Sequence, residues 1–343
     1  RTFYCQTIKL YHTLMKKNLK RLWQAALAVC LLAAPMAACS DDDENDPVLP
    51  GDGQPETPAD SLDDAGEAVL DSTEFYCYKG DSRIYGLLYK KVAAGRRAPA
   101  VVLSHSSSLT HAAMKGYAKA LAEKGMVAYC FDFCGGSKQS LSEGSTDSMT
   151  VFTEADDLNA VLTAVRGLDC VDPDSVYLLG SSQGGLVSAL VAEQRADELA
   201  GMVLFYPAFN LPDLVRQFAG LLSGGGFGSG WGGSWGGSWG DLGDMLSMSQ
   251  LFIDAVRDFD VWSHIGSFSK PVLILHGSAD IIVPVSNSEK AVQLYPDATL
   301  QVIEGANHGF NAANLGSLGS LLGAKADYDP VVLPHVYRFV GRE

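Results

Sequence analysis

A serine that could act as a nucleophile lies in the segment Gly180-Ser181-Ser182-Gln183-Gly184, which carries the pattern G-x-S-x-G. The apolar run at residues 176–179 is typical of a buried strand, and residues 186–192 are typical of a helix. A serine at such a turn has a strained backbone that only small neighbours can pack around, and its hydroxyl is exposed at the helix N-terminus. We therefore interpret Ser182 as a nucleophile. The alternative is a glycine-rich turn that only packs a helix against a strand.

A serine hydroxyl needs a base before it can attack at neutral pH. Asp280 follows the strand-like run at residues 272–275, and His308 follows another at residues 299–303. If these runs are parallel strands, both side chains lie beside Ser182 at the carboxyl edge of one sheet. The order of the three residues therefore predicts a triad, in which His308 takes the serine proton and Asp280 orients the imidazole.

The other histidines and acids are weaker candidates for these roles. His276 lies at the end of the run before Asp280, and we interpret it as structural. Asp297, in Tyr295-Pro296-Asp297-Ala298, is typical of a turn. Three histidines lack the surroundings of a catalytic motif: His111, His264 and His335.

Strand-like and helix-like patterns alternate from about Thr73 onward and indicate the elements that would position these residues. Residues 74–79 and 83–91 are typical of a hairpin around Gly80-Asp81-Ser82. A helical stripe with spacing i, i+3, i+4, i+7 is formed by Leu158, Val161, Leu162 and Val165. Buried-type runs occupy residues 100–104, 127–133, 176–179, 202–205, 272–275 and 299–303. The pattern predicts an α/β fold whose mostly parallel sheet is covered on both faces.

The connection between Tyr206 and Val272 is longer than an ordinary crossover and predicts a lid inserted at about residues 208–262. It contains a low-complexity repeat, Trp-Gly-Gly-Ser, with indoles at Trp231, Trp235 and Trp239. Glycines at this density disfavour a stable helix. The indoles either have no specific contact or stack on an aromatic acyl group or a sugar ring.

These motifs resemble the cinnamoyl/feruloyl esterase branch of the α/β-hydrolase superfamily. The resemblance extends over residues 73–340 and rests on residues 105–108, 131–136, 152–158, 180–185, 276–284 and 305–310. It implies the α/β-hydrolase fold and the hydrolysis of carboxylic esters through an acyl-enzyme, with no metal or cofactor. Feruloyl or acetyl esters of plant polysaccharide would be the substrates. Ser181 departs from the histidine of many relatives, so the packing below the turn is expected to differ.

The resemblance also implies an oxyanion hole made of two backbone N–H groups. One belongs to Gln183, directly after the nucleophile. The other belongs to Ser107, in the loop His105-Ser106-Ser107-Ser108 that follows residues 100–104. Relatives have glycine where this chain has Ser106. If that position requires a positive φ, the serine would strain the loop and weaken the hole.

The first 38 residues resemble an export signal rather than part of the fold. A basic stretch at residues 15–21 precedes an apolar run at residues 22–34 that is too short to cross a bilayer. The segment Met36-Ala37-Ala38-Cys39 resembles a bacterial lipobox, which implies that Met15 is the start and that Cys39 is lipidated. The alternative is a cleaved secretory peptide without lipid.

An acidic segment follows Cys39 and resembles the surface-export signal of Bacteroidota lipoproteins. Residues 40–70 contain eleven acidic and no basic residues, together with four prolines, and we expect residues 39–72 to form a disordered tether. The hydrolase domain would then span residues 73–343. These features predict an exported lipoprotein of the outer membrane, exposed at the cell surface and bound to the membrane through its lipid.

Charge and cysteine content exclude other classes of function. The net charge is −15, and loss of residues 1–38, which carry six basic and no acidic residues, would leave −21, so nucleic acid is not expected as a partner. The seven cysteines are scattered and suggest no metal site. Two alternatives to an esterase stay open: a serine peptidase of the prolyl-oligopeptidase type, and a non-catalytic surface-binding protein on a hydrolase scaffold.

Overall fold

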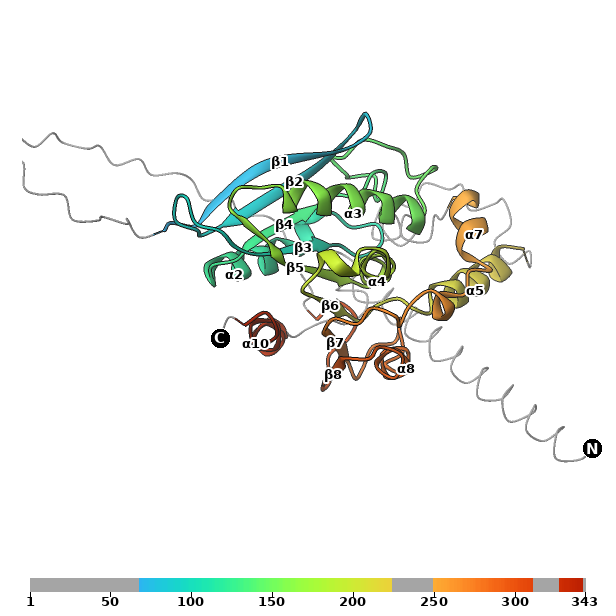
Figure 1. Cartoon of the computed structure of the whole chain (residues 1–343). Coiled ribbons are helices and arrows are strands. Elements are labelled where there is room, and N and C mark those ends of the chain that lie inside the picture. Colours follow the sequence, from blue (N-terminus) through green and yellow to red (C-terminus); the bar gives the residue numbers. More distant parts are fainter. Residues whose placement is uncertain (1–67, 224–248, 311–326, 342–343) are drawn as a thin grey trace, which may run out of the picture. The chain divides into compact units, whose positions relative to one another are not determined.

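One sheet with the strand order β1-β2-β4-β3-β5-β6-β7-β8 forms the centre of the computed structural model, which describes residues 68–223, 249–310 and 327–341 (Figure 1). The described residues all belong to one compact unit, Asp63–Glu343. The strands are β1 (Asp71–Lys79), β2 (Ser82–Lys90), β3 (Ala98–Ser104), β4 (Val127–Phe131), β5 (Val171–Ser181), β6 (Gly201–Phe205), β7 (Val272–Gly277) and β8 (Ala298–Ile303).

The sheet is parallel from β4 through β8, and β2 runs antiparallel to both β1 and β4. The predicted hairpin and the mostly parallel sheet are therefore confirmed. The run predicted at residues 127–133 is shorter than expected and ends at Phe131. Directly after the strand, the Asp132 carboxylate accepts the backbone N–H groups of His111 and Leu141, which belong to other segments of the chain.

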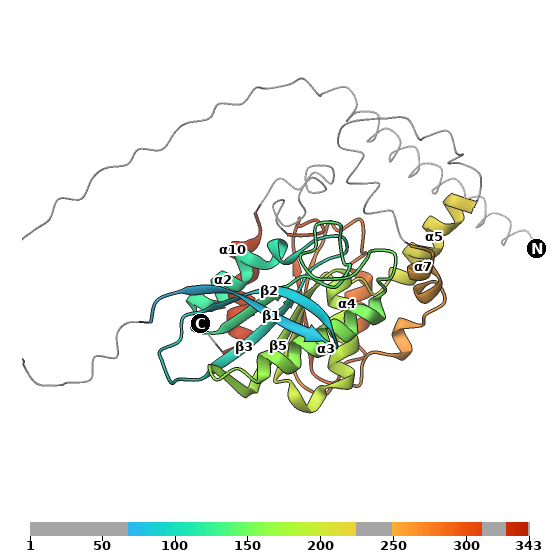
Figure 2. The same ribbon diagram turned by 90° about the horizontal axis from the view of Figure 1, so that it is seen from above.

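Helices cover both faces of the sheet, as Figure 2 shows. On one face lie α3 (Val151–Arg166), α4 (Gln183–Gln194) and α8 (Ser286–Val292); on the other lie α2 (Lys115–Glu123) and α10 (Asp329–Phe339). The predicted stripe of α3 is fully buried against the first face. Burial of that stripe is what stabilises the helix, with a capping box at Thr150 and Thr153 fixing its start.

The flanks of the predicted lid contain helices α5 (Leu211–Ser223) and α7 (Gln250–Val256) and a short 3-10 turn, η3 (Val261–Ser263). Phe252 and Val256 of α7 are buried, and Phe259 packs edge-on against Phe152 of α3. Cys39, Trp231, Trp235 and Trp239 lie outside the described residues. Among the helices that are described, none combines the length and the apolar character needed to cross a membrane.

Candidate active site

Ser182 lies at the turn between β5 and α4 with φ 51° and ψ −115°, a backbone conformation that costs a serine free energy. Its N–H donates to the carbonyl of Phe205 at 2.9 Å. A Cβ added to Gly180 would lie 2.3 Å from the carbonyl oxygen of Gly184, and one added to Gly184 would lie 2.4 Å from that of His105. The expectation that only small neighbours fit around this turn is therefore confirmed.

The structure brings the three predicted residues together at the carboxyl edge of the sheet. His308, in the loop after β8, places Nε2 at 3.0 Å from Oγ of Ser182 and Nδ1 at 2.7 Å from Oδ2 of Asp280, in the loop after β7. All three are buried. A carboxylate only accepts, so Nδ1 carries the imidazole proton and Nε2 is left to accept the serine hydroxyl. The arrangement can remove a proton from Ser182.

The Asp280 carboxylate is held at both oxygens. Its Oδ1 accepts the backbone N–H groups of Ile282 and Val283, each at 2.9 Å. Burial alone would raise the pKa of Asp280, but hydrogen bonds from His276 and His308 outweigh it, and the pKa lies below its usual value. The carboxylate is therefore ionised and able to stabilise the charge that His308 acquires when it takes a proton.

His276 has contacts that the sequence did not reveal. It is fully buried, with Nδ1 2.7 Å from Oγ of Ser288 and Nε2 2.8 Å from the carbonyl oxygen of Val283. The same Nε2 lies 3.3 Å from Oδ2 of Asp280. In the sequence, the short spacing between His276 and Asp280 at the end of one strand was the only feature that could have predicted this contact.

The residues predicted to form the oxyanion hole are both found beside the turn. Gln183 is the first residue of α4, and Ser107 lies in the loop after β3. In the described part of the chain, neither backbone N–H donates to an acceptor. Both groups are therefore available to an anion.

Backbone strain in the loop after β3 lies at Ser108 and not at Ser106. Positive φ among the described non-glycine residues occurs at Ser108, Ser182, Tyr206 and Phe310, and therefore not at Ser106. Ser106 instead places its hydroxyl 3.0 Å from the hydroxyl of Ser181. The serine at this position ties the loop to the nucleophile turn and does not strain it.

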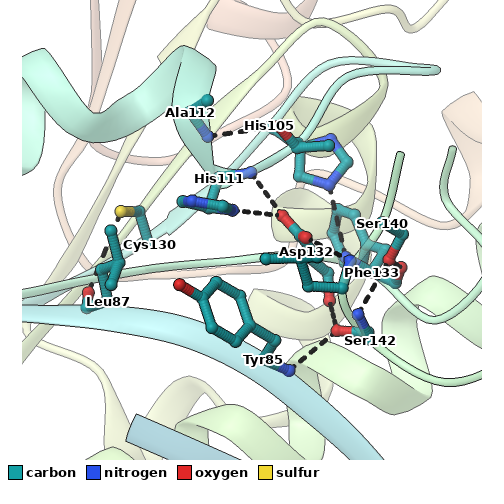
Figure 3. Close-up of polar contacts among 12 residues, drawn as sticks. Tyr85, Leu87, His105, His111, Ala112, Cys130, Asp132, Phe133, Ser140 and Ser142 are labelled. Atoms are coloured by element: carbon teal, nitrogen blue, oxygen red, sulfur yellow. Dashed lines mark hydrogen bonds and ion pairs between the residues drawn. The ribbon is translucent and has the colours of Figure 1, made fainter. Parts of the chain in front are cut away.

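The end of β4 anchors the same loop on both sides (Figure 3). His105, at the start of the loop, donates from Nδ1 to the carbonyl of Ser106 at 2.8 Å and accepts the N–H of Phe133 at 3.3 Å. Burial lowers the pKa of His105, which favours this neutral tautomer. At the other side, His111 donates its backbone N–H and its Nδ1–H to Asp132, at 2.6 and 2.7 Å. The backbone that carries Ser107 is thus fixed by two side-chain anchors.

Tyr206 packs directly against the triad and was not singled out from the sequence. It follows β6 at φ 36°, is buried, and its ring centroid lies 4.5 Å from that of His308. Burial raises the pKa of its hydroxyl, and hydrogen bonding with Ser181 and Ser106 opposes this. One aromatic side chain therefore packs against the imidazole of His308.

Gln183 also links the turn to a buried acid in α3. Its Nε2 donates to Oε2 of Glu154 at 2.7 Å, and Glu154 is 1% exposed. Burial raises the pKa of Glu154 from 4.5 to about 8; the hydrogen bond from Gln183 opposes this shift, and the nearby charge of Asp157 adds to it. Glu154 is thus protonated in the folded chain at pH values where an exposed glutamate is ionised.

We expect this acid to make stability fall as pH rises. Between pH 4.5 and about pH 8, the folded state holds a proton on Glu154 that the unfolded state releases. The free energy of unfolding therefore falls by on the order of 1.4 kcal/mol for each pH unit. Glu154→Gln removes this contribution, and its free energy of unfolding should exceed that of the wild type increasingly from pH 5 to pH 8. Urea unfolding at both pH values measures the difference.

The exposed Glu123, at the end of α2, provides the matched control. Glu123→Gln should unfold with the pH dependence of the wild type. If Glu154→Gln does the same, Glu154 is ionised throughout this range and the burial argument is wrong.

No group of three or more histidine, cysteine, aspartate or glutamate side chains that could hold a metal ion occurs within residues 68–223, 249–310 and 327–341.

Comparison with families and curated proteins gives two partial matches. Residues 95–229 match the family model described as Serine aminopeptidase, S33; this stretch contains Ser182 and ends before Asp280 and His308. The non-heme chloroperoxidase CPO-A1 of Kitasatospora aureofaciens is 36% identical over 58 residues, which are 17% of this chain. The match spans about a fifth (21%) of that protein's length, so its activity is not carried over.

Solved structures match over most of the chain. Est1E from Butyrivibrio proteoclasticus, in a structure with ferulic acid bound, has a TM-score of 0.56 at 21% identity, covering 73% of this chain and 97% of its own. The α/β hydrolase GrgF from Penicillium sp. sh18 has a TM-score of 0.53 at 18% identity, with 75% and 96% covered. The esterase EaEST from Exiguobacterium antarcticum has 0.51 at 18%, with 74% and 98% covered. At these identities the likeness shows a shared fold.

Proposed function

We propose that this chain, which has the α/β-hydrolase fold, is a serine hydrolase that cleaves carboxylic esters. One observation carries the proposal: Ser182, His308 and Asp280 are joined by contacts of 3.0 and 2.7 Å at a strained turn. Packing alone does not require side chains from the loops after β5, β7 and β8 to be joined in this order. An acyl transfer does require a serine, a histidine and an aspartate joined in this way.

The reaction would proceed in two steps. Oγ of Ser182 attacks the ester carbonyl while Nε2 of His308 takes the hydroxyl proton, and the N–H groups of Gln183 and Ser107 stabilise the oxyanion. His308 returns the proton to the leaving alcohol, and an acyl-enzyme remains. Water then attacks the acyl group, giving its proton to His308, and the carboxylic acid leaves as Ser182 recovers its proton.

The substrates that we propose are feruloyl or acetyl esters of plant polysaccharide. The sequence motifs support this choice, and Est1E, a protein of the same fold, binds ferulic acid in its solved structure. A second candidate, a serine peptidase, is favoured by the match of residues 95–229 to a serine aminopeptidase family.

A panel of substrates on purified protein tests these alternatives. We expect turnover of p-nitrophenyl acetate, p-nitrophenyl butyrate and methyl ferulate, and none of aminoacyl p-nitroanilides. Turnover of the anilides with a higher kcat/KM than the esters would favour the peptidase. If no substrate is turned over and a fluorophosphonate does not label Ser182, the chain is a non-catalytic binding protein.

The tryptophan repeat gives a test of acyl-group recognition. If the indoles stack on an aromatic acyl group, replacing Trp231, Trp235 and Trp239 together by alanine removes roughly 0.5–1.5 kcal/mol of binding beyond burial. KM for methyl ferulate should then rise several-fold, while KM for p-nitrophenyl acetate stays nearly constant. Equal effects on both esters, or none on either, would assign the repeat a structural or incidental role.

We also propose that the protein is a lipoprotein of the outer membrane, exposed at the cell surface. Lipid on Cys39 would supply the anchoring free energy. Cys39→Ala should therefore move the protein from the membrane fraction to the soluble fraction or leave it unprocessed, which fractionation and N-terminal mass analysis measure. Native protein that is already soluble, with another N-terminal residue, would contradict the proposal.

A further inference from the structure

The Asp280 carboxylate is shared by two imidazoles rather than one. Oδ2 lies 2.7 Å from Nδ1 of His308 and 3.3 Å from Nε2 of His276, near the end of β7, the strand that precedes Asp280. Oδ1 is occupied by the N–H groups of Ile282 and Val283. Among the described residues, no lysine or arginine pairs with this buried carboxylate. Its negative charge is therefore balanced by N–H donors alone.

The proton of His276 can be assigned from its partners. The carbonyl of Val283, 2.8 Å from Nε2, can only accept, so Nε2 carries a proton. In the neutral ring, Nδ1 then accepts the hydroxyl of Ser288, 2.7 Å away on α8. Both Ser288 and His276 are fully buried, so water does not compete for these contacts. The ring is fixed with its Nε2–H donating to the carbonyl of Val283, and Nε2 lies 3.3 Å from Oδ2 of Asp280.

We propose that His276 is a positioning residue for the triad, which holds the Asp280 carboxylate in the orientation that presents Oδ2 to Nδ1 of His308. The backbone N–H groups of Ile282 and Val283 fix Oδ1. The Nε2–H of His276 then prevents the carboxylate from rotating about Oδ1. The described polar partners of His276 are Ser288, Val283 and Asp280 and do not include Ser182, so it would act through Asp280.

Replacing His276 by glutamine or by asparagine distinguishes a positioning role from a packing role, because these two side chains are similar in polarity and differ in length. Glutamine at position 276 can place an amide N–H near the site of Nε2, within reach of Asp280. Asparagine is one carbon shorter and reaches only the position of Nδ1, beside Ser288. His276→Gln should keep kcat for p-nitrophenyl acetate within about three-fold of the wild type. His276→Asn should lower kcat by about ten-fold or more, as expected when a catalytic group is misplaced by a fraction of an ångström, with KM nearly unchanged. His264→Gln, at the exposed residue directly after η3, is the control.

The inference rests on the proposed function, so the experiment includes a readout that needs no substrate. The Nδ1–H proton of His308 should give a low-field NMR resonance, assigned by its loss in His308→Gln. We expect it to be retained in His276→Gln and shifted or broadened in His276→Asn. If wild-type protein turns over no ester, the proposed function fails, whereas the resonance still decides the role of His276.

Equal kcat values and identical low-field resonances in His276→Asn and His276→Gln would overturn the proposal. If His276→Asn does not fold, Ser288→Ala replaces it, because the ring then loses the hydrogen bond from this hydroxyl at Nδ1. This variant should lower kcat about three-fold and shift the His308 resonance. An unchanged kcat together with an unchanged resonance would assign His276 to packing.

Discussion

Replacing Ser182 by alanine should lower kcat/KM for ester substrates by roughly 10³-fold or more. The hydroxyl of Ser182 is the group that Nε2 of His308 reaches, at 3.0 Å, and without it no acyl-enzyme forms. The remaining rate would come from oxyanion stabilisation and substrate binding. Steady-state hydrolysis of p-nitrophenyl acetate measures the loss, and thermal unfolding verifies that the fold is intact, since alanine keeps the Cβ and the same backbone strain.

Ser181→Ala is the matched control, because it removes a neighbouring hydroxyl and leaves the nucleophile in place. Its activity should stay within about ten-fold of the wild type, the ordinary range for a change beside the site. The nucleophile assignment is wrong if Ser182→Ala keeps more than a tenth of wild-type activity, or if a fluorophosphonate labels another residue.

Asp280→Asn should also have a large effect, a loss of about 10³- to 10⁴-fold in kcat. The amide of asparagine can keep an oxygen on the N–H groups of Ile282 and Val283, which places its NH₂ group toward Nδ1 of His308. Nδ1 must then accept, so the proton moves to Nε2 and faces Ser182. An imidazole in this tautomer cannot take the serine proton. Single-turnover acylation with p-nitrophenyl acetate measures the effect without interference from product release.

Asp297→Asn, in the exposed turn before β8, should leave acylation unchanged. If Asp280→Asn acylates within ten-fold of the wild type, another group orients His308. Loss of acylation in both variants would indicate a general effect of charge rather than a specific partner.

The arrangement of Ser182, Asp280 and His308 could be predicted from the sequence because it follows from chain order. A parallel sheet places the ends of β5, β7 and β8 at one edge, so residues directly after those strands converge without further information. The glycines at positions 180 and 184 could be predicted for the same reason, since a strand-to-helix turn of this kind excludes a Cβ at either one.

The supporting contacts could not be predicted, because their partners are far apart in the sequence and meet only through packing. Glu154 reaches Gln183 from α3, and Tyr206 reaches His308 from the end of β6. Nothing in the local pattern around Glu154 distinguishes a buried acid from a solvated one. The concern about Ser106 was misplaced because a positive φ depends on the path of the whole loop, and that path places it at Ser108.

The conformation of Ser182 also bears on what selection has maintained. A non-glycine residue at φ 51° holds about 1–3 kcal/mol of strain, a sizeable part of the margin by which most domains stay folded. Glycine would adopt the same backbone without this cost. A lineage selected for thermal robustness alone would therefore drift toward glycine at position 182. A serine at this position is kept at a cost in stability, as its proposed role as the nucleophile would require.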